Sequence, residues 1–560
     1  MVKDYSESVV KCCLKKYLLD KKLLPIIEEW VINSSKIAFR GSLIVNHFLL
    51  YCINNGLQLP DLDDRLFYHQ AFTIGLTGSI SCSKEVPYLK DFVINNQKFY
   101  QELNRITGDT QLIHYLADQY MVNFSNSLIC NFEKRQRLFI NKIGIQNNWT
   151  KDQCYDILCS INNWNHKNVL DKSEEIQTLI KKHKQILQLN DNEKLSDYWI
   201  KKNLNNILIY QYYILKYFEV NNIKSFNLAP IYSMGRKFIT IDSKILYFLM
   251  KQAKLYDGNE KEFIKDKDKY FNQVFNIKKL SKKEFGYFLQ TDGTSLCVHF
   301  HTPIIKFEIK DKQEIKDKDE RVIAIDPGRT NLIYGVEEIG NNKFVTYKLT
   351  KKQYYNDAHF TRNKKKLENY NKNVEELTTE LTKYSSKTCD IEKYELFLIK
   401  IKQNIDVLQS HYMNIKCAKI KMDNYIHKNK TVDKFFNTMK KKGEKEPTIA
   451  YGAAKFAPNG KGELSAPTTF LAKKCAKKFK IKFVDEFRTT KCCADCESEL
   501  KLMKRGSLDI RGLKCCRSSK CFKFPLKSRD KNAGKNILIC YKLPNRPNYL
   551  SRNVPLLTEG

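Results

Sequence analysis

The chain has 560 residues, too many for one compact core, and this length predicts two to four domains. Its 97 lysines and arginines outnumber 62 acidic residues, so the formal net charge is +35. This charge favours a polyanionic partner, above all nucleic acid, although a chain from an AT-rich genome shows part of the same excess. The first ten residues hold no apolar export core, and the longest apolar stretch, 42–53, is too short to cross a bilayer. We therefore expect an intracellular protein with no membrane partner, whose cysteines are thiols or metal ligands.

The first part of the chain divides into a helical segment and a smaller β segment. Residues 1–227 are predicted to be mainly helical, because stretches such as 112–143 place apolar residues at three- and four-residue steps. Residues 228–315 contain β-branched and aromatic runs, such as 295–300, that predict strands. The charged segment 310–321 predicts a connector to the next domain.

The segment after this connector predicts the core of another domain. Its first apolar run predicts a buried central strand that ends at Asp326, directly before Pro-Gly. Two long polar helices with a break near 385–390 are expected over 356–430, and we interpret them as a helical hairpin inserted between strands. A final helix is expected to begin near Arg529. Further strands are predicted at 333–338, 448–452 and 481–487, with a helix over 466–480.

Six of the 18 cysteines fall within residues 492–521. Two sulfur pairs about 20 residues apart are typical of a zinc ribbon, in which four thiolates bind one structural Zn²⁺ tetrahedrally. No histidine lies in this region, so cysteine must supply all four ligands. Cys492 and Cys516 are doublet partners that could replace a neighbour, and buried thiols without metal are the other interpretation. We expect the zinc ligands to be Cys493, Cys496, Cys515 and Cys521.

Two aspartates stand at positions that suit metal ligands. Asp326 follows a buried strand, and Asp530 lies at the start of the final helix. Hydrolysis of a phosphodiester at neutral pH needs an activated water and neutralisation of charge on the phosphate, and two Mg²⁺ ions supply both. Mg²⁺ prefers carboxylate oxygens on rigid elements. A lone aspartate is more often a helix cap or a turn former, but the two together favour a two-metal site.

Several short motifs are specific in combination. Residues 325–328, Ile-Asp-Pro-Gly, resemble the first RuvC motif, and residues 529–537 resemble the third. The predicted ribbon lies between the strand 481–487 and this third motif, as in TnpB-type nucleases. The resemblance to the RNA-guided Fanzor and TnpB family covers roughly residues 230–540. Further stretches that resemble Fanzor proteins are 236–242, 291–294 and 485–491.

The resemblance implies a multidomain α+β fold and a function. The fold would comprise a helical recognition lobe, a small wedge-like β-barrel and an RNase H-like RuvC domain with an inserted four-cysteine zinc ribbon. The function would be that of an RNA-guided DNA endonuclease, encoded by a mobile element, in which base pairing selects the target. The implied boundaries are 1–227 for the lobe, possibly including the first wedge strands, and 228–315 for the wedge-like domain. The first RuvC part, with its hairpin 356–430, would span 316–487. The ribbon would span 488–528, and the last RuvC part with the tail would span 529–560.

The third metal ligand departs from the pattern of many RuvC proteins. The strand 448–452, where they carry a glutamate, reads Thr-Ile-Ala-Tyr-Gly and holds no acid. Fanzor proteins similarly carry this glutamate on the strand before the ribbon, so the resemblance assigns the third catalytic Mg²⁺ ligand to Glu486, with the two aspartates. Asp485 and Glu463 are the alternatives. Strand alternation points Asp485 and Glu486 to opposite faces, so only one of them should reach the metals.

Basic residues near these elements are candidate phosphate contacts. The helix 466–480 carries four lysines on one face, which is either an ordinary solvated surface or a phosphate-binding face. The predicted nucleic-acid-binding residues are Lys473, Lys474, Lys477, Lys478, Arg488 and Arg529.

Three functions fit these residues. The favoured one is an RNA-guided DNA endonuclease that acts as a monomer with its guide RNA on double-stranded target DNA. The second is an unguided RNase H-fold nuclease or transposase, which predicts no tightly bound RNA. The third is an RNA- and DNA-binding regulator whose catalytic site has decayed, as the missing acid on 448–452 would suggest. An intracellular location is expected for each, in the nucleus if the host is eukaryotic or viral.

Overall fold

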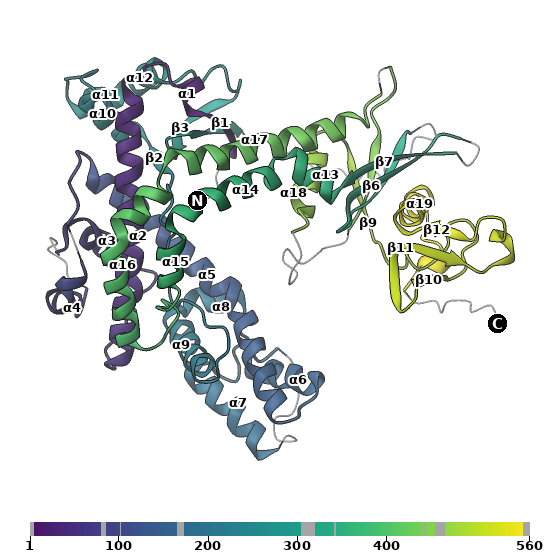
Figure 1. Ribbon diagram of the computed structural model, residues 1–560, viewed down its shortest axis with the longest axis horizontal. Helices are drawn as coiled ribbons and strands as arrows, with labels where there is room; N and C mark the ends of the chain where they lie inside the picture. The colour runs from purple at the N-terminus through teal and green to yellow at the C-terminus, as the bar shows by residue number, and fades with distance from the viewer. Residues whose placement is uncertain are drawn as a thin grey trace. The chain divides into compact units, whose positions relative to one another are not determined.

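A computed structural model of the chain contains two compact units (Figure 1). Unit 1 comprises Met1–Lys306 and Tyr370–Lys419, and unit 2 comprises Phe307–Asn369 and Ile420–Gly560. Of the connector predicted at 310–321, residues 310–319 lie outside the described residues. The structure describes residues 5–79, 86–100, 102–164, 173–303, 320–340, 343–441, 443–453 and 465–552.

Unit 1 is mainly helical, and its two longest helices, α2 and α5, run through its apolar core. By length and composition α2 could span a membrane, but 78% of its most apolar window is buried inside the protein, as in a core helix. The helices are α1 (Leu14–Tyr17), α2 (Leu23–Asn54), α3 (Arg65–Thr77), α4 (Leu89–Asn96), η1 (Gln97–Phe99), α5 (Asp109–Gln146), α6 (Lys151–Ile161), α7 (Glu174–Leu187), α8 (Asp197–Lys202), α9 (Leu204–Val220), α10 (Ser243–Gln252), α11 (Glu260–Lys265), α12 (Lys267–Val274), η3 (Lys372–Val374), α15 (Glu375–Leu381) and α16 (Ile391–Tyr412).

The β part of unit 1 is an antiparallel sheet in the order β1-β4-β3-β2. β1 pairs with β4 along its whole length, so a strand from within residues 1–227 completes the sheet. In the described residues the sheet is open and is not the barrel that the resemblance implies, because β1 and β2 each have one neighbour. The strands are β1 (Tyr5–Cys13), β2 (Ile239–Ile241), β3 (Glu284–Thr291) and β4 (Ser295–Pro303).

The outer part of the predicted hairpin 356–430 packs within unit 1. Its helix α16 lies beside α2 (Figure 1), where the Tyr394 hydroxyl donates to the Leu43 carbonyl at 3.2 Å. Glu395 Oε1 also lies 3.3 Å from His47 Nε2. The two long helices predicted for this segment are broken further, because short turns separate α14, α15, α16 and α17.

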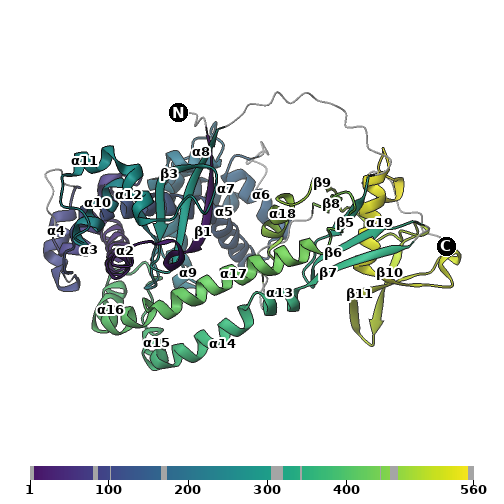
Figure 2. The ribbon, with the colours of Figure 1, turned by 90° about the horizontal axis from the view of Figure 1, so that it is seen from above.

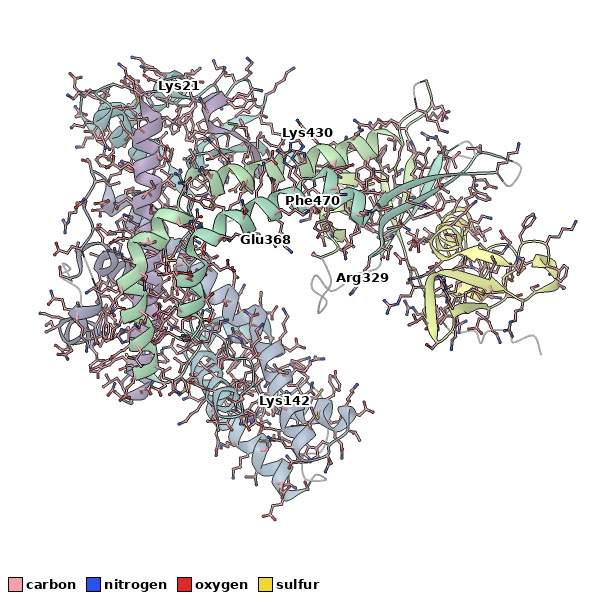
Figure 3. The ribbon with its side chains drawn as sticks, in the orientation of Figure 1. Lys21, Lys142, Arg329, Glu368, Lys430 and Phe470 are labelled. Carbon is pink, nitrogen blue, oxygen red and sulfur yellow. The ribbon has the colours of Figure 1, made fainter. Side chains whose placement is uncertain are left out.

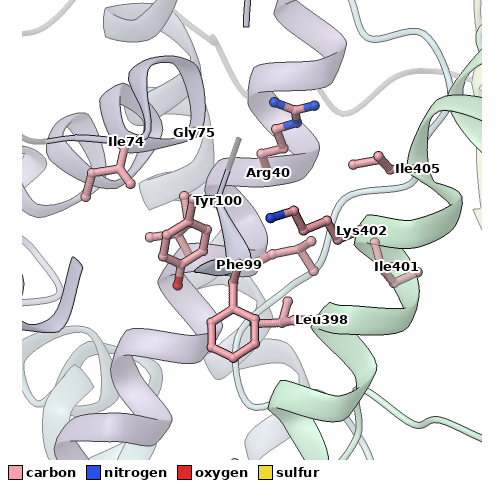
Figure 4. Close-up of a pocket in the computed structure, with 11 residues that line it drawn as sticks. Arg40, Ile74, Gly75, Phe99, Tyr100, Leu398, Ile401, Lys402 and Ile405 are labelled. Atoms are coloured by element: carbon pink, nitrogen blue, oxygen red, sulfur yellow. The ribbon is translucent and has the colours of Figure 1, made fainter. Parts of the chain in front are cut away.

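A small pocket in unit 1 lies among α2, α3 and α16 (Figure 4). Its lining is mainly apolar, and the charged ends of Arg40 and Lys402 reach toward it. No acidic side chain lines it, so it offers no site for the chemistry predicted from the sequence. Its apolar lining residues include Leu43, Ile44, Ile74, Phe99, Leu398, Ile401 and Ile405.

Unit 2 is built on a mixed sheet in the order β7-β6-β5-β8-β9. β5, β6 and β7 are antiparallel neighbours, whereas β8 and β9 run parallel to β5. The central strands β5 and β8 are fully buried, as their apolar runs predicted. The strands are β5 (Val322–Asp326), β6 (Asn331–Glu338), β7 (Phe344–Thr350), β8 (Thr448–Gly452) and β9 (Ile481–Val484).

Alternate residues of β5 enter two different cores, one on each face of the sheet. Ile323 and Ile325 pack with residues of α17 and α18, whereas Val322 and Ala324 pack with α19. A Cβ at Gly534 would overlap the side chain of Val336, so glycine allows α19 to lie close against the sheet (Figure 2). The helices are α13 (Lys351–Asp357), α14 (Phe360–Asn371), α17 (Ile415–Asn437), α18 (Thr468–Ala476), α19 (Arg529–Lys542), η4 (Ser519–Cys521) and η5 (Asn548–Leu550).

A small second sheet in unit 2 carries the clustered cysteines. It is antiparallel, has the order β10-β11-β12, and lies between β9 and α19 along the chain. Its strands are β10 (Leu500–Arg505), β11 (Leu508–Cys516) and β12 (Leu526–Ser528).

Candidate active site and cysteine cluster

Three parallel strands of unit 2 end at the same edge of the sheet. β5 ends at Asp326, β8 at Gly452 and β9 at Val484. Ligands of open α/β sheets bind at this edge, because the loops that leave the strands converge there. Glu486 follows β9 by two residues, and Asp530 is the second residue of α19, which packs on β5 and β6. The structure therefore brings the three predicted acids from separate segments to one edge.

Gly452 leaves open the space that the Glu486 carboxylate occupies. A Cβ at position 452 would overlap this carboxylate, lying 2.6 Å from its carbon, and would lie 2.9 Å from Pro327 Cδ. Any side chain at this position would therefore have to displace the carboxylate. β8, which holds no acid, therefore leaves room for Glu486, which follows β9.

Asn331 positions Asp530. Its Nδ2 donates to Asp530 Oδ2 at 2.6 Å. Asn331 is the first residue of β6, and a Cβ at Gly328 would lie 2.6 Å from the Asn331 carbonyl oxygen, so the turn between β5 and β6 is tight. No role was predicted for Asn331 from the sequence, because an asparagine shortly after Pro-Gly is typical of a turn.

Burial and neighbouring charge disfavour the ionised form of Asp326. Its side chain is only 6% exposed. Desolvation, with repulsion from Glu486 and Asp530, raises the pKa of Asp326 well above its ordinary value, while the charge of Arg529 acts in the opposite direction. A divalent cation would compensate this repulsion, and an all-oxygen donor set suits Mg²⁺.

The spacing of the acids bears on how many ions they could hold. Among the described residues, the ligand atoms of these three acids do not all lie within 4.8 Å of one another. Asp326 nevertheless interacts electrostatically with both of the other acids. Because Asp326 interacts with each of the other two acids, this arrangement suits more than one ion better than one ion bound by all three.

Of the two alternatives for the third acid, the structure describes Asp485 but not Glu463. Asp485 turns away from the site, because Arg552 Nη2 lies 3.1 and 2.9 Å from its two carboxylate oxygens. Burial raises its pKa, but the bonds from Arg552 and the Phe487 N–H outweigh this effect and lower it. Glu463 lies outside the described residues. Asp485 and Glu486 thus point in different directions, but strand alternation is not the cause, because β9 ends at Val484 and both acids lie in the loop that follows.

Four sulfur atoms converge in the ribbon, and they belong to Cys493, Cys496, Cys516 and Cys521. The Sγ atoms of Cys493 and Cys521 are 3.8 Å apart, and those of Cys496 and Cys516 are 3.3 Å apart. Tetrahedral Zn–S bonds of about 2.3 Å place sulfurs about 3.8 Å apart, so the cluster fits a zinc ion. The four-cysteine cluster expected from the spacing is present, with one change of membership.

Cys516 takes the position predicted for Cys515. The two are successive residues of β11, so their side chains point to opposite faces, and only Cys516 points to the cluster. Cys492, the other doublet partner, instead lies 3.3 Å from the Tyr549 carbonyl oxygen through its Sγ. The spacing of the doublets left both choices open, because the register of β11 is set by its pairing with β10.

Two asparagines of α19 attach the ribbon to the helix that carries Asp530. Asn532 and Asn536 are buried, and each donates through Nδ2 to the carbonyl oxygens of Thr489 and Cys492 at 2.7–3.1 Å. Asn532 Oδ1 also accepts from the Ala494 N–H at 2.9 Å. The start of the cysteine cluster is therefore held directly against the helix.

The lysines predicted on the helix 466–480 divide into two pairs. Lys474 and Lys478 face α17, where their Nζ atoms lie 3.6 and 3.4 Å from the Asp433 carboxylate. Lys473 and Lys477 are exposed. Lys473 and Lys477 are therefore better placed to contact a phosphate than Lys474 and Lys478.

The two predicted arginines have different surroundings. Arg529 is exposed, and its charge lowers the pKa of Asp326, so it lies within electrostatic reach of the acids. The Arg488 guanidinium lies 5.2 Å from the centre of the Phe487 ring. Of the two, the structure relates Arg529 directly to the acidic edge.

A groove beside the ribbon was not predicted from the sequence. We call it the Phe522 groove. Phe522 and Phe524 in its wall are 86% and 77% exposed, which is unusual for phenylalanine. Exposed aromatic rings among lysines are typical of surfaces on which nucleic-acid bases stack. The alternation of lysine and phenylalanine at 520–524 was the available signal. Its lysines are Lys520, Lys523, Lys527, Lys535 and Lys542.

Several solved structures are similar to this chain, and one of them is described here. A Cas12f1 protein, solved in complex with a single guide RNA and target DNA, is 12% identical to this chain. The match covers 96% of this chain and 99% of that chain, with a TM-score of 0.22, which is too low to support an argument about fold or function. No family model matches the sequence, and no curated protein matches it.

Proposed function

We propose that the chain is an RNA-guided DNA endonuclease that cleaves phosphodiester bonds by a Mg²⁺-dependent, RuvC-type mechanism. The observation that carries the proposal is the meeting of Asp326, Glu486 and Asp530 at the carboxyl edge of a mixed sheet, with Gly452 leaving room for Glu486. The mixed sheet with an acid at the end of its central strand agrees with the RNase H-like fold that the sequence motifs imply.

The three acids would hold Mg²⁺, which supplies an activated water and neutralises charge on the phosphate when bound. Asn331 keeps the Asp530 carboxylate in one orientation through its 2.6 Å hydrogen bond. Burial of Asp326 keeps bulk water away from the centre of the site, which strengthens its interactions with charged groups. Arg529 is placed to contact a phosphate beside the acids.

The partners would be a guide RNA and double-stranded target DNA. The net charge of +35 favours binding to both through their phosphates. The Phe522 groove combines exposed rings with lysines and suits an unpaired strand, which a guided nuclease must hold once the guide has displaced it. The ribbon would be a structural zinc module that presents this groove, because its four thiolates leave no open metal position.

The first test is the RNA that the protein retains. The chain would be expressed with its native flanking DNA, purified, and any nuclease-protected RNA sequenced. A discrete structured RNA with a variable end that matches nearby DNA is the expected result. Heterogeneous host RNA would overturn the guided function and leave an unguided nuclease.

The second test is cleavage of a DNA that matches the recovered guide, in Mg²⁺. Asp326→Asn, Glu486→Gln and Asp530→Asn should each lose activity by several orders of magnitude, because each removes a charged metal ligand. Asp485→Asn is the matched control and should retain activity, since Asp485 faces Arg552. Full activity of Glu486→Gln would overturn the site, and tightly bound RNA with DNA left intact by the wild type would indicate a regulator.

A further inference from the structure

A second group of metal-binding side chains in unit 2 uses none of the acids or cysteines above. The ligand atoms of His359, Asp423 and His427 all lie within 4.8 Å of one another. His359 directly precedes α14, whereas Asp423 and His427 lie one turn apart on the same face of α17. Figure 3 labels Glu368 on α14 and Lys430 on α17, the two helices that this group joins.

The distances within the group suit one small cation. His359 Nδ1 lies 2.9 Å from Asp423 Oδ2, and His427 Nε2 lies 3.5 Å from Asp423 Oδ1. Tetrahedral bonds of 2.0–2.2 Å to zinc place its ligand atoms about 3.3–3.5 Å apart, so the 3.5 Å pair fits this value and the 2.9 Å pair is shorter by about 0.4 Å. The two imidazole rings are stacked, with centres 3.6 Å apart and planes at 24°. Both histidines therefore meet the same carboxylate from neighbouring positions.

The carboxylate at the centre is held by a buried side chain. Asn363 on α14 is 1% exposed, and its Nδ2 donates to Asp423 Oδ2 at 2.8 Å and to Asn424 Oδ1 at 2.7 Å. Fixed outer partners of this kind orient the ligands of protein metal sites. His359 also has a φ of 62°, a conformation in which glycine is the usual residue, so its side chain is retained at some backbone cost.

Two neighbouring histidine rings alone do not make such a group. His69 and His114 in unit 1 also lie close together, with ring centres 4.5 Å apart and planes tilted at 35°. The carboxylate near them, Asp118, is bound by Arg65 at 2.7 Å, and they are not part of a metal-binding group in the described residues. What distinguishes His359 and His427 is the carboxylate that they share.

We propose that His359, Asp423 and His427 bind one borderline divalent cation, Zn²⁺ or a chemically similar ion such as Co²⁺ or Ni²⁺, and that this ion clamps the start of α14 to α17. Two imidazole nitrogens and one carboxylate suit this class of ion, whereas Mg²⁺ prefers oxygen ligands throughout. The three side chains are 24–38% exposed, so an ion can enter, and a water molecule would complete the shell.

The test is the zinc content of the full-length protein. Wild type and variants would be dialysed against excess Zn²⁺ with Mg²⁺ present and then against zinc-free buffer, and zinc per chain would be measured by mass spectrometry. His359→Asn and His427→Gln should each bind one zinc fewer than wild type. His114→Gln, from the other histidine pair, should bind as many as wild type. Equal zinc content in all four proteins would overturn the site.

Cobalt separates this site from the cysteine cluster. In the Co²⁺-loaded protein, His427→Gln should lose part of the visible d–d absorption and keep the thiolate-to-metal band of the ribbon. Loss of the thiolate band instead would assign the missing ion to the ribbon and overturn the site. This measurement does not involve cleavage, so its result does not depend on whether the proposed nuclease function is correct.

The clamp is tested by hydrogen exchange. Zn²⁺ should slow amide exchange at the start of α14 and at residues 423–427 of α17 in wild type, because the ion ties the two segments together. It should have no such effect in His427→Gln. Zinc bound at this site without slower exchange in either segment would overturn the clamp.

Discussion

Asp326 is the residue at which stability and the proposed function conflict most directly. Its pKa is raised in the folded chain, so its stabilising contribution is full below the unfolded pKa and is lost as the pH rises through the folded pKa. Above the unfolded pKa and without divalent cations, the raised pKa of Asp326 should therefore make the protein less stable than a variant without this carboxyl group. Asp326→Asn is expected to raise Tm by a few degrees in EDTA, measured by scanning calorimetry.

Mg²⁺ provides the matched comparison. It should raise the Tm of wild type, because it binds the folded acids, and should have a much smaller effect on Asp326→Asn. Asp485→Asn removes a carboxylate that is paired with Arg552 and should not raise Tm in EDTA. A Tm for Asp326→Asn at or below that of wild type in EDTA would contradict the electrostatic conflict inferred at this site.

Gly452 offers a second prediction for a single residue. In Gly452→Ala the new methyl group would overlap the Glu486 carboxylate and move it from its place beside β8. Cleavage should fall by about 10²-fold or more, because a shift of about 1 Å in a catalytic group has effects of this size. Zinc content and overall folding should be unchanged. Gly512→Ala, at a position with no atom within 4 Å of the added Cβ, is the control and should leave cleavage unaffected.

Among the elements, α19 links the cysteine ribbon to the acidic edge. Replacing Asn532 or Asn536 with aspartate keeps the shape but removes the donors to the Thr489 and Cys492 carbonyls. Each change should cost about 1–3 kcal/mol, because the new aspartate oxygen is a buried acceptor without a donor that faces the two carbonyl oxygens, while the other asparagine still donates to both. Urea unfolding and hydrogen exchange of residues 489–496 would measure the effect. Lys531→Gln, a neighbouring change in the same helix, should leave both unchanged.

The strand elements show where sequence periodicity is reliable. The predicted strand 448–452 coincides with β8, because a short apolar run between polar segments has to be buried in a sheet. The strand predicted at 481–487 ends earlier, at Val484, so the acids that follow lie in a loop. Within 356–430, the break predicted near 385–390 lies between α15 and α16, whereas the further breaks before α15 and before α17 were not predicted.

At the scale of the whole molecule, Glu219 attaches the inserted segment to unit 1. Its carboxylate accepts from the Cys389 N–H at 2.9 Å and the Thr388 hydroxyl at 2.7 Å, and it pairs with Lys393 at 3.1 Å. Burial raises its pKa, but these hydrogen bonds outweigh burial and lower the pKa from 4.5 to about 2. The carboxylate therefore stabilises the fold above the unfolded pKa, and this contribution is lost as the pH falls toward about 2.

Glu219→Gln should therefore lose about 1–3 kcal/mol of stability at neutral pH and show a flatter dependence on pH below about 4.5. Denaturant unfolding at several pH values would measure both effects. Glu133→Gln is the control, because Glu133 pairs with Arg137 on an exposed helix surface and should matter little. A steep acid dependence that persists in Glu219→Gln would assign the acid sensitivity to other carboxylates.

The sequence by itself determined which residue types form the candidate sites, but not which of two neighbouring residues takes part. Asp326 and Asp530 were recognisable because a buried strand and a helix start frame them, and the cysteines were recognisable by spacing. The choice of Cys516 over Cys515 depended on the register of β11, which its pairing with β10 sets. A one-residue shift in a strand reverses the face of every side chain, and spacing alone does not contain that information.

Only the tertiary structure decided the relations between distant segments. The fit of the Glu486 carboxylate beside Gly452, the bond from Asn331 to Asp530 and the meeting of His359 with Asp423 each join residues that lie 34 or more positions apart. Such pairs carry no periodic signal, because the chain brings them together through strand order and helix packing. Local residue patterns determine which elements form, whereas the burial of their apolar faces determines which polar groups meet at their ends.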